Sequence, residues 1–161
     1  MIKTSRNLRI HEPSFIPQFI DQGNSSKVYR ISDNLAAKVL YRRDKNDNPF
    51  LRNDSNAISL LLHEESIARE CIKNKIAVPN PTGILKIPIE GRIYLAYLMR
   101  FIEGVPIWRY SKVSDLFERE IEKASEIFNI GDYKGNGIWC PSEKKVYLID
   151  FQSGSVKSKN S

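Results

Sequence analysis

The sequence has few cysteines, no long apolar run and no apolar leader, and each absence excludes a class of protein. Its 161 residues include two cysteines, Cys71 and Cys140, which are too few for a disulfide framework and have no metal-ligand spacing around them. No apolar stretch is long enough to span a membrane. Residues 1–11 lack the apolar central region of a secretory signal peptide. We therefore expect a domain of a reducing compartment, cytoplasmic by default, with no membrane span.

Positive charge is in modest excess, but it is not concentrated. The net charge is +6, and the densest basic groups are the pairs at 42–43 and 144–145 and the tail at 157–159. This spread favours a solvated basic surface over a dedicated nucleic-acid face, so we expect no specific nucleic-acid partner. The hydrophobic fraction of 41% is enough for a core and argues against wholesale disorder.

Periodicity predicts an α+β chain. We expect strands at 26–31, 35–41, 84–89, 92–101, 138–140 and 145–151, and helices at 57–75 and 115–128. The turn chemistry at 32–34 and at Glu90-Gly91 joins the first two strand pairs. Residues 43–56 are polar and contain Pro49, so they are predicted to be a loop. We divide the chain into a loosely ordered extension (1–14), an N-terminal lobe (15–103) and a minimal C-terminal lobe (104–161).

A lone lysine lies inside an apolar predicted strand. Because alternate strand residues face opposite sides, Lys38 shares the covered face with Ala36 and Leu40. A buried ammonium needs a partner, since its desolvation is costly. The alternative is an edge-strand lysine whose ammonium reaches water.

The first predicted helix supplies a carboxylate for that lysine. At about 100° per residue, one face is apolar, and Glu64 falls near the middle of it, with Glu65 toward its edge. The apolar residues of this face are Ala57, Leu60, Leu61, Ile67, Ala68, Cys71 and Ile72. An uncompensated buried charge costs on the order of 3–5 kcal/mol, so Lys38 is the natural partner of Glu64. The alternatives are a purely structural ion pair, or a Glu64 that reaches solvent.

Two polar turns can hold phosphates or assist their transfer. The turn at 21–29 contains one glycine, Gly23, and small residues there let backbone N–H groups approach a phosphate. In the later loop, Asp132 can orient or deprotonate a hydroxyl, Lys134 can neutralise charge on a transferring phosphoryl group, and Asn136 can hold a metal ion. The alternative for both segments is an ordinary polar turn.

The last predicted strand ends in an aspartate. Asp150 follows an apolar run, which is a costly place for a charge unless a metal ion or a hydrogen-bond donor meets it. A magnesium ion that bridges phosphates is such a partner. The alternative is an aspartate that caps the following turn.

In their order along residues 15–154, these segments resemble the protein-kinase superfamily. Residues 21–28 look like its glycine-rich loop with only the middle glycine, Gly23, and the resemblance implies that Ser25, Ser26 and Val28 contact the nucleotide. Lys38 and Glu64 match the strand lysine and its helix partner. The implied fold has two lobes, an antiparallel-sheet N-lobe and a strongly truncated helical C-lobe, and the implied cofactors are ATP and Mg²⁺.

The remaining segments extend the resemblance. Residues 98–104 look like the hinge, which makes Met99 the gatekeeper and implies that the backbone of Arg100 and Ile102 binds adenine. Residues 131–134 look like the catalytic loop, with Asp132 and Lys134 as catalytic residues. Residues 149–152 look like the metal-binding DFG motif, with Asp150 as the metal ligand, assisted by Asn136.

The sequence departs from the family pattern at several positions. Ile130 stands where a histidine is expected, and Gly137 stands where the metal-binding asparagine is expected, so that Asn136 comes one residue early. The chain ends ten residues after Phe151, which leaves no room for an activation loop or for helices that dock peptides. This is similar to the minimal effector kinases of bacterial type III secretion, of the OspG and HopBF types. That resemblance implies delivery into the host cytoplasm and a host protein partner, such as a chaperone or the ubiquitin-conjugating machinery.

Three functions are consistent with these residues. The first, our leading hypothesis, is a Ser/Thr protein kinase that uses ATP and Mg²⁺. The second is a pseudokinase that binds nucleotide as an interaction module, which the single loop glycine and the displaced Asn136 favour. The third is a small-molecule phosphotransferase of the aminoglycoside type, which the segments 78–81 and 102–106 resemble.

Overall fold

The computed structural model describes residues 9–22, 26–43, 46, 49–51, 55–129, 137–149 and 155–156. The chain forms two compact units. The first unit comprises residues 1–62 and 81–101, and the second comprises residues 63–80 and 102–161. The helix α1 (Ser55–Lys73) therefore contributes its beginning to one unit and its end to the other.

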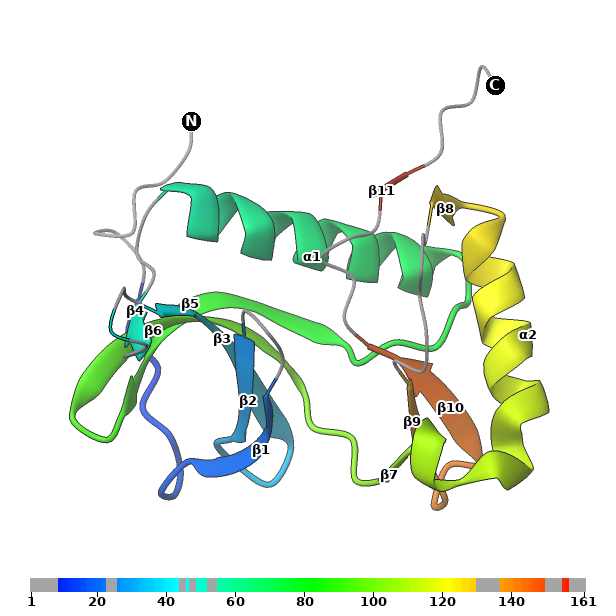
Figure 1. The fold of residues 1–161 in the computed structure, drawn as a ribbon, viewed down its shortest axis with the longest axis horizontal. Helices are drawn as coiled ribbons and strands as arrows, with labels where there is room; N and C mark the ends of the chain where they lie inside the picture. Colours follow the sequence, from blue (N-terminus) through cyan, green and yellow to red (C-terminus); the bar gives the residue numbers. More distant parts are fainter. Residues whose placement is uncertain are drawn as a thin grey trace. The chain divides into compact units, whose positions relative to one another are not determined.

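The first unit is built on an antiparallel sheet (Figure 1). Its path runs β1-β2-β3-β6-β5, and the bounds are β1 (Gln18–Gln22), β2 (Ser26–Arg30), β3 (Leu35–Arg43), β5 (Pro81–Ile89) and β6 (Arg92–Arg100). The two strand pairs predicted around the turns at 32–34 and 90–91 are confirmed. Glu90 and Gly91 have φ values of 49° and 76°, which is the left-handed conformation that a two-residue hairpin turn demands.

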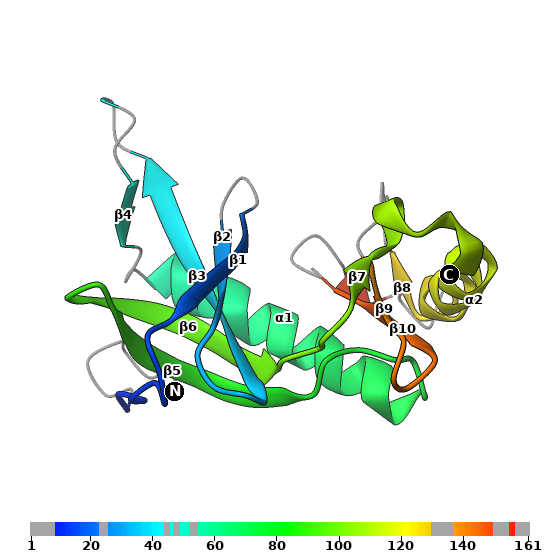
Figure 2. The same cartoon turned by 90° about the horizontal axis from the view of Figure 1, so that it is seen from below.

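Two segments of this unit differ from the sequence prediction. The polar stretch at 43–56 is not all loop, because β4 (Pro49–Leu51) pairs with the end of β3 (Figure 2). Proline is tolerated at the first residue of so short an edge strand, and three residues are too few for an alternating pattern to show. The prediction of loose order is also wrong for residues 9–11. The backbone N–H of Lys86 donates to the carbonyl of Arg9, and that of His11 donates to the carbonyl of Lys86, both at 2.8 Å. This segment pairs with the outer edge of β5, whose backbone groups are not bonded to another strand of the sheet.

Apolar side chains cover both faces of the sheet. On one face, Leu40, Leu95 and Tyr97 pack against Ala57, Ile58 and Leu61 from the beginning of α1. The other face carries a separate cluster of Ile31, Ala37, Val39, Ile87, Ile89, Ala96 and Leu98. This division follows from the alternation of side chains along each strand.

Within its described residues, the second unit contains one further α-helix and only short strands. Its helical elements are η2 (Ile107–Arg109), η3 (Ser111–Val113) and α2 (Ser114–Ser125). Its strands are β7 (Val105–Pro106), β8 (Phe128–Asn129), β9 (Gly137–Cys140), β10 (Lys145–Leu148) and β11 (Ser155–Val156). The second predicted helix thus ends three residues early, and the last predicted strand stops at Leu148.

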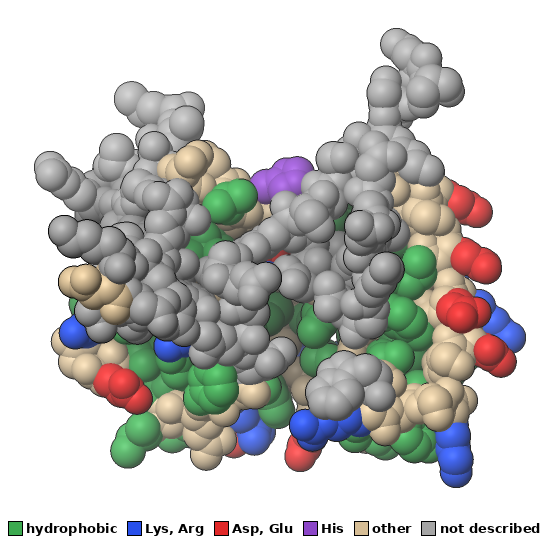
Figure 3. Space-filling view, viewed as in Figure 1, with side chains coloured by type: hydrophobic (Ala, Val, Ile, Leu, Met, Phe, Trp, Pro, Cys, Tyr) green, Lys and Arg blue, Asp and Glu red, His purple; other side chains and the backbone are tan. Residues whose placement is uncertain are grey.

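The core of the second unit lies between the end of α1, α2 and β10. Ile67, Ala68 and Cys71 of α1 are buried with Ala124 and Leu148, and Phe117 and Ile121 of α2 pack against them. The opposite side of α2 is solvated, and Figure 3 shows acidic and basic side chains along the edge where α2 runs in Figure 1. Such a division between apolar and charged faces is typical of a surface helix.

The end of α1 adopts a Schellman motif. Ile76 donates to the carbonyl of Cys71 at 2.8 Å, Lys75 donates to that of Ile72 at 3.0 Å, and Lys75 has a φ of 60°. Ile72, predicted to lie on the buried face, is 40% exposed, so that prediction is wrong. The motif buries Ile76 beside Cys71 instead, and Ile72 falls at the edge of the helical stripe.

The α+β fold class is confirmed. An antiparallel sheet with one long helix comes first in the chain, and a smaller part with one α-helix and short strands follows. This order agrees with the two-lobed kinase-like fold that the motifs predict. No helix among the described residues is long and apolar enough to cross a membrane.

Candidate functional site

The strand registers bring several predicted nucleotide-binding residues onto one face of the sheet. Val28 of β2 lies opposite Lys38 of β3, and Lys38 lies opposite Tyr97 of β6. Directly opposed residues of an antiparallel pair point to the same side. Tyr97 belongs to the cluster under α1, so Val28 and Lys38 share that face.

The neighbouring row extends this face toward the end of β6. Arg30 of β2 lies opposite Ala36 of β3, and Ala36 lies opposite Met99 of β6. Met99 is partly buried and packs against the cluster of Leu40, Leu61 and Leu95, whereas Ala36 is buried. Among the described residues of this face, Lys38 is the one buried cation and lies among small and apolar side chains, whereas Arg30 at the end of the row is only partly buried. That composition suits a flat heterocycle next to a phosphate chain.

Lys38 and Glu64 are the two buried charged side chains of the described residues. Lys38 is 4% exposed and Glu64 is 2% exposed. Each of them has an interaction partner, as buried ionisable groups require. The edge-strand alternative, in which the ammonium of Lys38 reaches water, is inconsistent with this burial.

Glu64 lies within the apolar stripe of α1, as the helical period predicts. Leu61 precedes it by three residues and Ala68 follows it by four, and both are buried. Glu65 is only partly buried, and its carboxylate accepts a hydrogen bond from Arg69 at 3.2 Å. Lys38 belongs to the first unit and Glu64 to the second, and their pairing stays a prediction.

The predicted hinge, residues 98–104, begins with the last three residues of β6. Arg100 is exposed and ends the strand, and Phe101 donates its backbone N–H to the carbonyl of Asn34 at 2.8 Å. Ile102 is 6% exposed and packs with Cys140 and Tyr147 in the second unit. The adenine-binding roles of Arg100 and Ile102 remain predictions from the sequence.

Several predicted site residues lie outside the described residues. These are Gly23, Ser25, Asp132, Lys134, Asn136 and Asp150. Their roles in phosphate binding, catalysis and metal binding therefore stay predictions. Ser26 is described and 8% exposed, opposite Leu40 in the register and hence on the face of Lys38. Within the described ranges, no three His, Cys, Asp or Glu side chains gather as a metal site would require.

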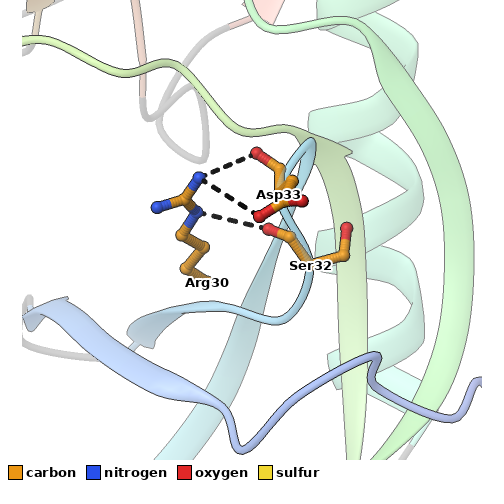
Figure 4. Close-up of polar contacts among 3 residues, drawn as sticks. All are labelled: Arg30, Ser32 and Asp33. Carbon is orange, nitrogen blue, oxygen red and sulfur yellow. Dashed lines mark hydrogen bonds and ion pairs between the residues drawn. The ribbon is translucent and has the colours of Figure 1, made fainter.

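Sequence reasoning missed two groups of contacts. Ala77, which follows α1, donates its N–H to Oε2 of Glu120 at 3.1 Å and accepts a hydrogen bond from the backbone of Leu148 at 2.9 Å. Arg30 holds the turn between β2 and β3 (Figure 4). Neither group of contacts has a sequence signal, because each involves backbone groups whose position only the folded chain defines.

Comparison with solved structures gives a distant likeness, which carries no argument about function. No protein-family model matches the chain, and no curated protein matches it in sequence. The chain is similar to a solved structure titled as the co-crystal structure of WbdD and the kinase inhibitor LY294002, with 16% sequence identity and a TM-score of 0.45. The match covers 88% of this chain and 34% of that chain, so this chain spans about a third of the other's length.

Proposed function

We propose that this chain binds ATP with Mg²⁺ and transfers the γ-phosphoryl group to a hydroxyl. The observation that carries the proposal is Lys38, a buried cation at the centre of a sheet face that it shares with Val28, Ala36 and Met99. An ammonium in such a place is stabilised by anionic partners, and the phosphates of ATP are suitable ones. The apolar neighbours on the same face suit the adenine ring.

The remaining roles follow from the kinase resemblance. Glu64 would orient Lys38, and Asp132 would take the proton of the attacking hydroxyl as its oxygen bonds to phosphorus and ADP leaves. Lys134 would neutralise charge on the transferring group. Asp150, with Asn136, would hold Mg²⁺, which supplies charge neutralisation at the β- and γ-phosphates when bound.

The proposed acceptor is a Ser or Thr hydroxyl of a host protein. This step rests on the resemblance to secreted minimal effector kinases, which implies delivery into a host cell and a chaperone or the ubiquitin-conjugating machinery as partner. Incubation of the protein with Mg²⁺ and ATP in a eukaryotic lysate, followed by mass spectrometry, should reveal new phosphosites. An Asp150→Ala variant should yield none above background.

The central test compares two lysines on opposite faces of the sheet. Lys38→Met should weaken Mg·ATP binding at least about tenfold and lower transfer about 100-fold, because the phosphates lose their cation. Lys27 lies opposite Val39, whose side chain belongs to the other face, so Lys27→Met removes an equal charge as a matched control. Calorimetric titration and phosphate transfer should show no more than about a twofold change for this control.

Two results would contradict the proposal in different ways. If the wild-type protein binds no nucleotide, both the binding and the transfer are wrong. If it binds ATP but yields no phosphosite in itself or in the lysate, the chain is a nucleotide-binding module. The single loop glycine and the displaced Asn136 favour this second function, and nucleotide binding independent of Mg²⁺ would support it.

A further inference from the structure

Arg30 joins the turn between β2 and β3 through two backbone acceptors (Figure 4). Its Nε donates to the carbonyl of Ser32 at 3.3 Å, and its Nη2 donates to the carbonyl of Asp33 at 3.0 Å. The carboxylate of Asp33 lies 4.0 Å from Nη2, but its side chain is 93% exposed, whereas that of Arg30 is 27% exposed. An ion pair this exposed contributes little, so the carbonyl bonds fix the guanidinium.

The same guanidinium lies over an aromatic ring at the end of β6. The Cζ atom of Arg30 is 4.2 Å from the ring centroid of Phe101. The backbone N–H of Phe101 is bound by Asn34, which belongs to the same turn. The turn itself is closed by Ile31 and Ser32, which both donate to the carbonyl of Leu35, at 3.0 and 3.3 Å. Phe101 is thus held through its backbone by Asn34 and through its ring by Arg30.

The clamp of Arg30 and Phe101 lies at the predicted adenine-binding end of the sheet face. In the register, Arg30 continues the row of Ala36 and Met99. Phe101 follows Met99 by two residues and directly follows Arg100, whose backbone is predicted to bind adenine. A change in the position of Phe101 therefore changes the backbone of Arg100, since the two share a peptide unit.

We propose that Arg30 is a positioning residue for nucleotide recognition: acting through Phe101, it fixes the backbone that binds the adenine ring. The inference rests on the proposed function. A guanidinium suits this task because it is planar, stacks on a ring and donates in fixed directions to two carbonyls at once. A segment held in its binding conformation loses less entropy when the ligand binds, which raises affinity.

The test separates the adenine end of the ligand from the phosphate end. Calorimetric titrations would measure the binding of Mg·ATP, adenosine and Mg·tripolyphosphate to the wild type and to Arg30→Ala. We expect ATP and adenosine to bind about five- to tenfold more weakly to Arg30→Ala, and tripolyphosphate to change less than about twofold. A general loss of structure would weaken all three ligands.

Matched variants sharpen the result. Arg30→Lys keeps the charge but cannot stack while donating to both carbonyls, so its affinity for adenosine should lie between those of the wild type and Arg30→Ala. Asp33→Ala removes only the exposed carboxylate and leaves the carbonyl acceptor, so adenosine binding should stay within about twofold of the wild type. Phe101→Leu should weaken adenosine about as much as Arg30→Ala, and the double variant should be no weaker than either.

Each result that contradicts the proposal overturns one particular step of it. Unchanged adenosine binding in Arg30→Ala, or an equal loss of tripolyphosphate, overturns the role of Arg30. Additive effects of Arg30→Ala and Phe101→Leu overturn its action through Phe101. A wild-type protein that binds none of the three ligands overturns the proposed function itself, and this result does not depend on any Arg30 variant.

Discussion

The long strands of the first unit have nine residues each, whereas the strands of the second have two to four. In the first unit, alternating side chains supply a cluster on each face of the sheet. In the second unit, two glycines lie so close to neighbouring atoms that an added Cβ would require a shift. A Cβ at Gly104 would overlap the carbonyl oxygen of Trp139, and one at Gly137 would lie 2.8 Å from the ring of Phe117. The comparison teaches that the second unit, besides its own apolar core, depends on close packing at glycine, whereas a Cβ at Gly83 or Gly91 of the first unit would meet nothing within 4 Å.

Gly104→Ala should have the largest effect. Because the overlap is with a backbone oxygen, which cannot rotate away, we expect a loss of about 4 kcal/mol or more in the free energy of unfolding. Gly137→Ala meets only side chains, which can shift, so about 1–3 kcal/mol is expected. In Gly91→Ala of the first unit, the added Cβ would meet no atom within 4 Å, but alanine is unfavourable at a φ of 76°. We therefore expect a loss of about 1 kcal/mol in the free energy of unfolding. Urea denaturation measures all three, and equal losses would contradict the comparison.

Leu61→Ala tests side-chain packing in the first unit. Leu61 is fully buried under the sheet, and its truncation should lower the free energy of unfolding by about 2–5 kcal/mol. The next residue, Leu62, is 47% exposed, and Leu62→Ala should change it by less than about 0.5 kcal/mol. Thermal or urea unfolding distinguishes the two variants, and similar values would mean that α1 does not stabilise the sheet through this face.

Glu120→Ala tests the polar contact that holds the segment after α1 in the second unit. The partly buried N–H of Ala77 would lose its acceptor, and we expect a loss of about 1–2 kcal/mol in the free energy of unfolding. Glu120→Gln keeps an oxygen acceptor but loses the charge next to Lys123, 2.6 Å away, so it should retain most of the stability. If the two variants unfold at the same urea concentration, the hydrogen bond to Ala77 contributes nothing.

Lys75→Gly should stabilise the protein by about 1 kcal/mol. Lys75 holds a φ of 60° at the end of α1, a conformation that is unfavourable for a side chain and free for glycine. The control is Lys73→Gly, two residues earlier and at the last residue of α1, which should destabilise the protein by a similar amount. The midpoint of thermal unfolding measures both, and a lower midpoint for Lys75→Gly would contradict the Schellman geometry.

The smallest effect at neutral pH comes from Cys71. Burial, with the nearby charges of Glu70 and Glu120, raises the pKa of its thiol from 9.0 to about 12. The unfolded thiol therefore ionises from about pH 9 while the folded thiol keeps its proton, so stability is complete below pH 9 and falls as the pH rises toward 12. Cys71→Ala should make this decline shallower. The free energy of unfolding measured between pH 8 and pH 11 checks it, and an unchanged slope would contradict the assignment.

The main strands of the first unit and the buried face of α1 could be predicted from the sequence because they depend on local patterns. The alternation around Lys38 and the helical period around Glu64 predicted the burial of both side chains, and the Glu90-Gly91 pair predicted its own turn. The edge strand β4 and the pairing of Arg9 and His11 with Lys86 could not be predicted in this way. Both are backbone pairings to free strand edges, which require no side-chain pattern.

By itself, the sequence determined the α+β class, the order of the longer strands and the two α-helices, and which charged residues enter the apolar faces, because periodicity and turn chemistry act between near neighbours. The tertiary structure decided which of these residues share one face: the registers place Val28, Lys38, Ala36 and Met99 together, although they come from three strands. It also decided the clamp of Arg30 and Phe101 and the contact of Glu120 with Ala77. These contacts join groups far apart in the chain, whose distances are set only when the chain has folded.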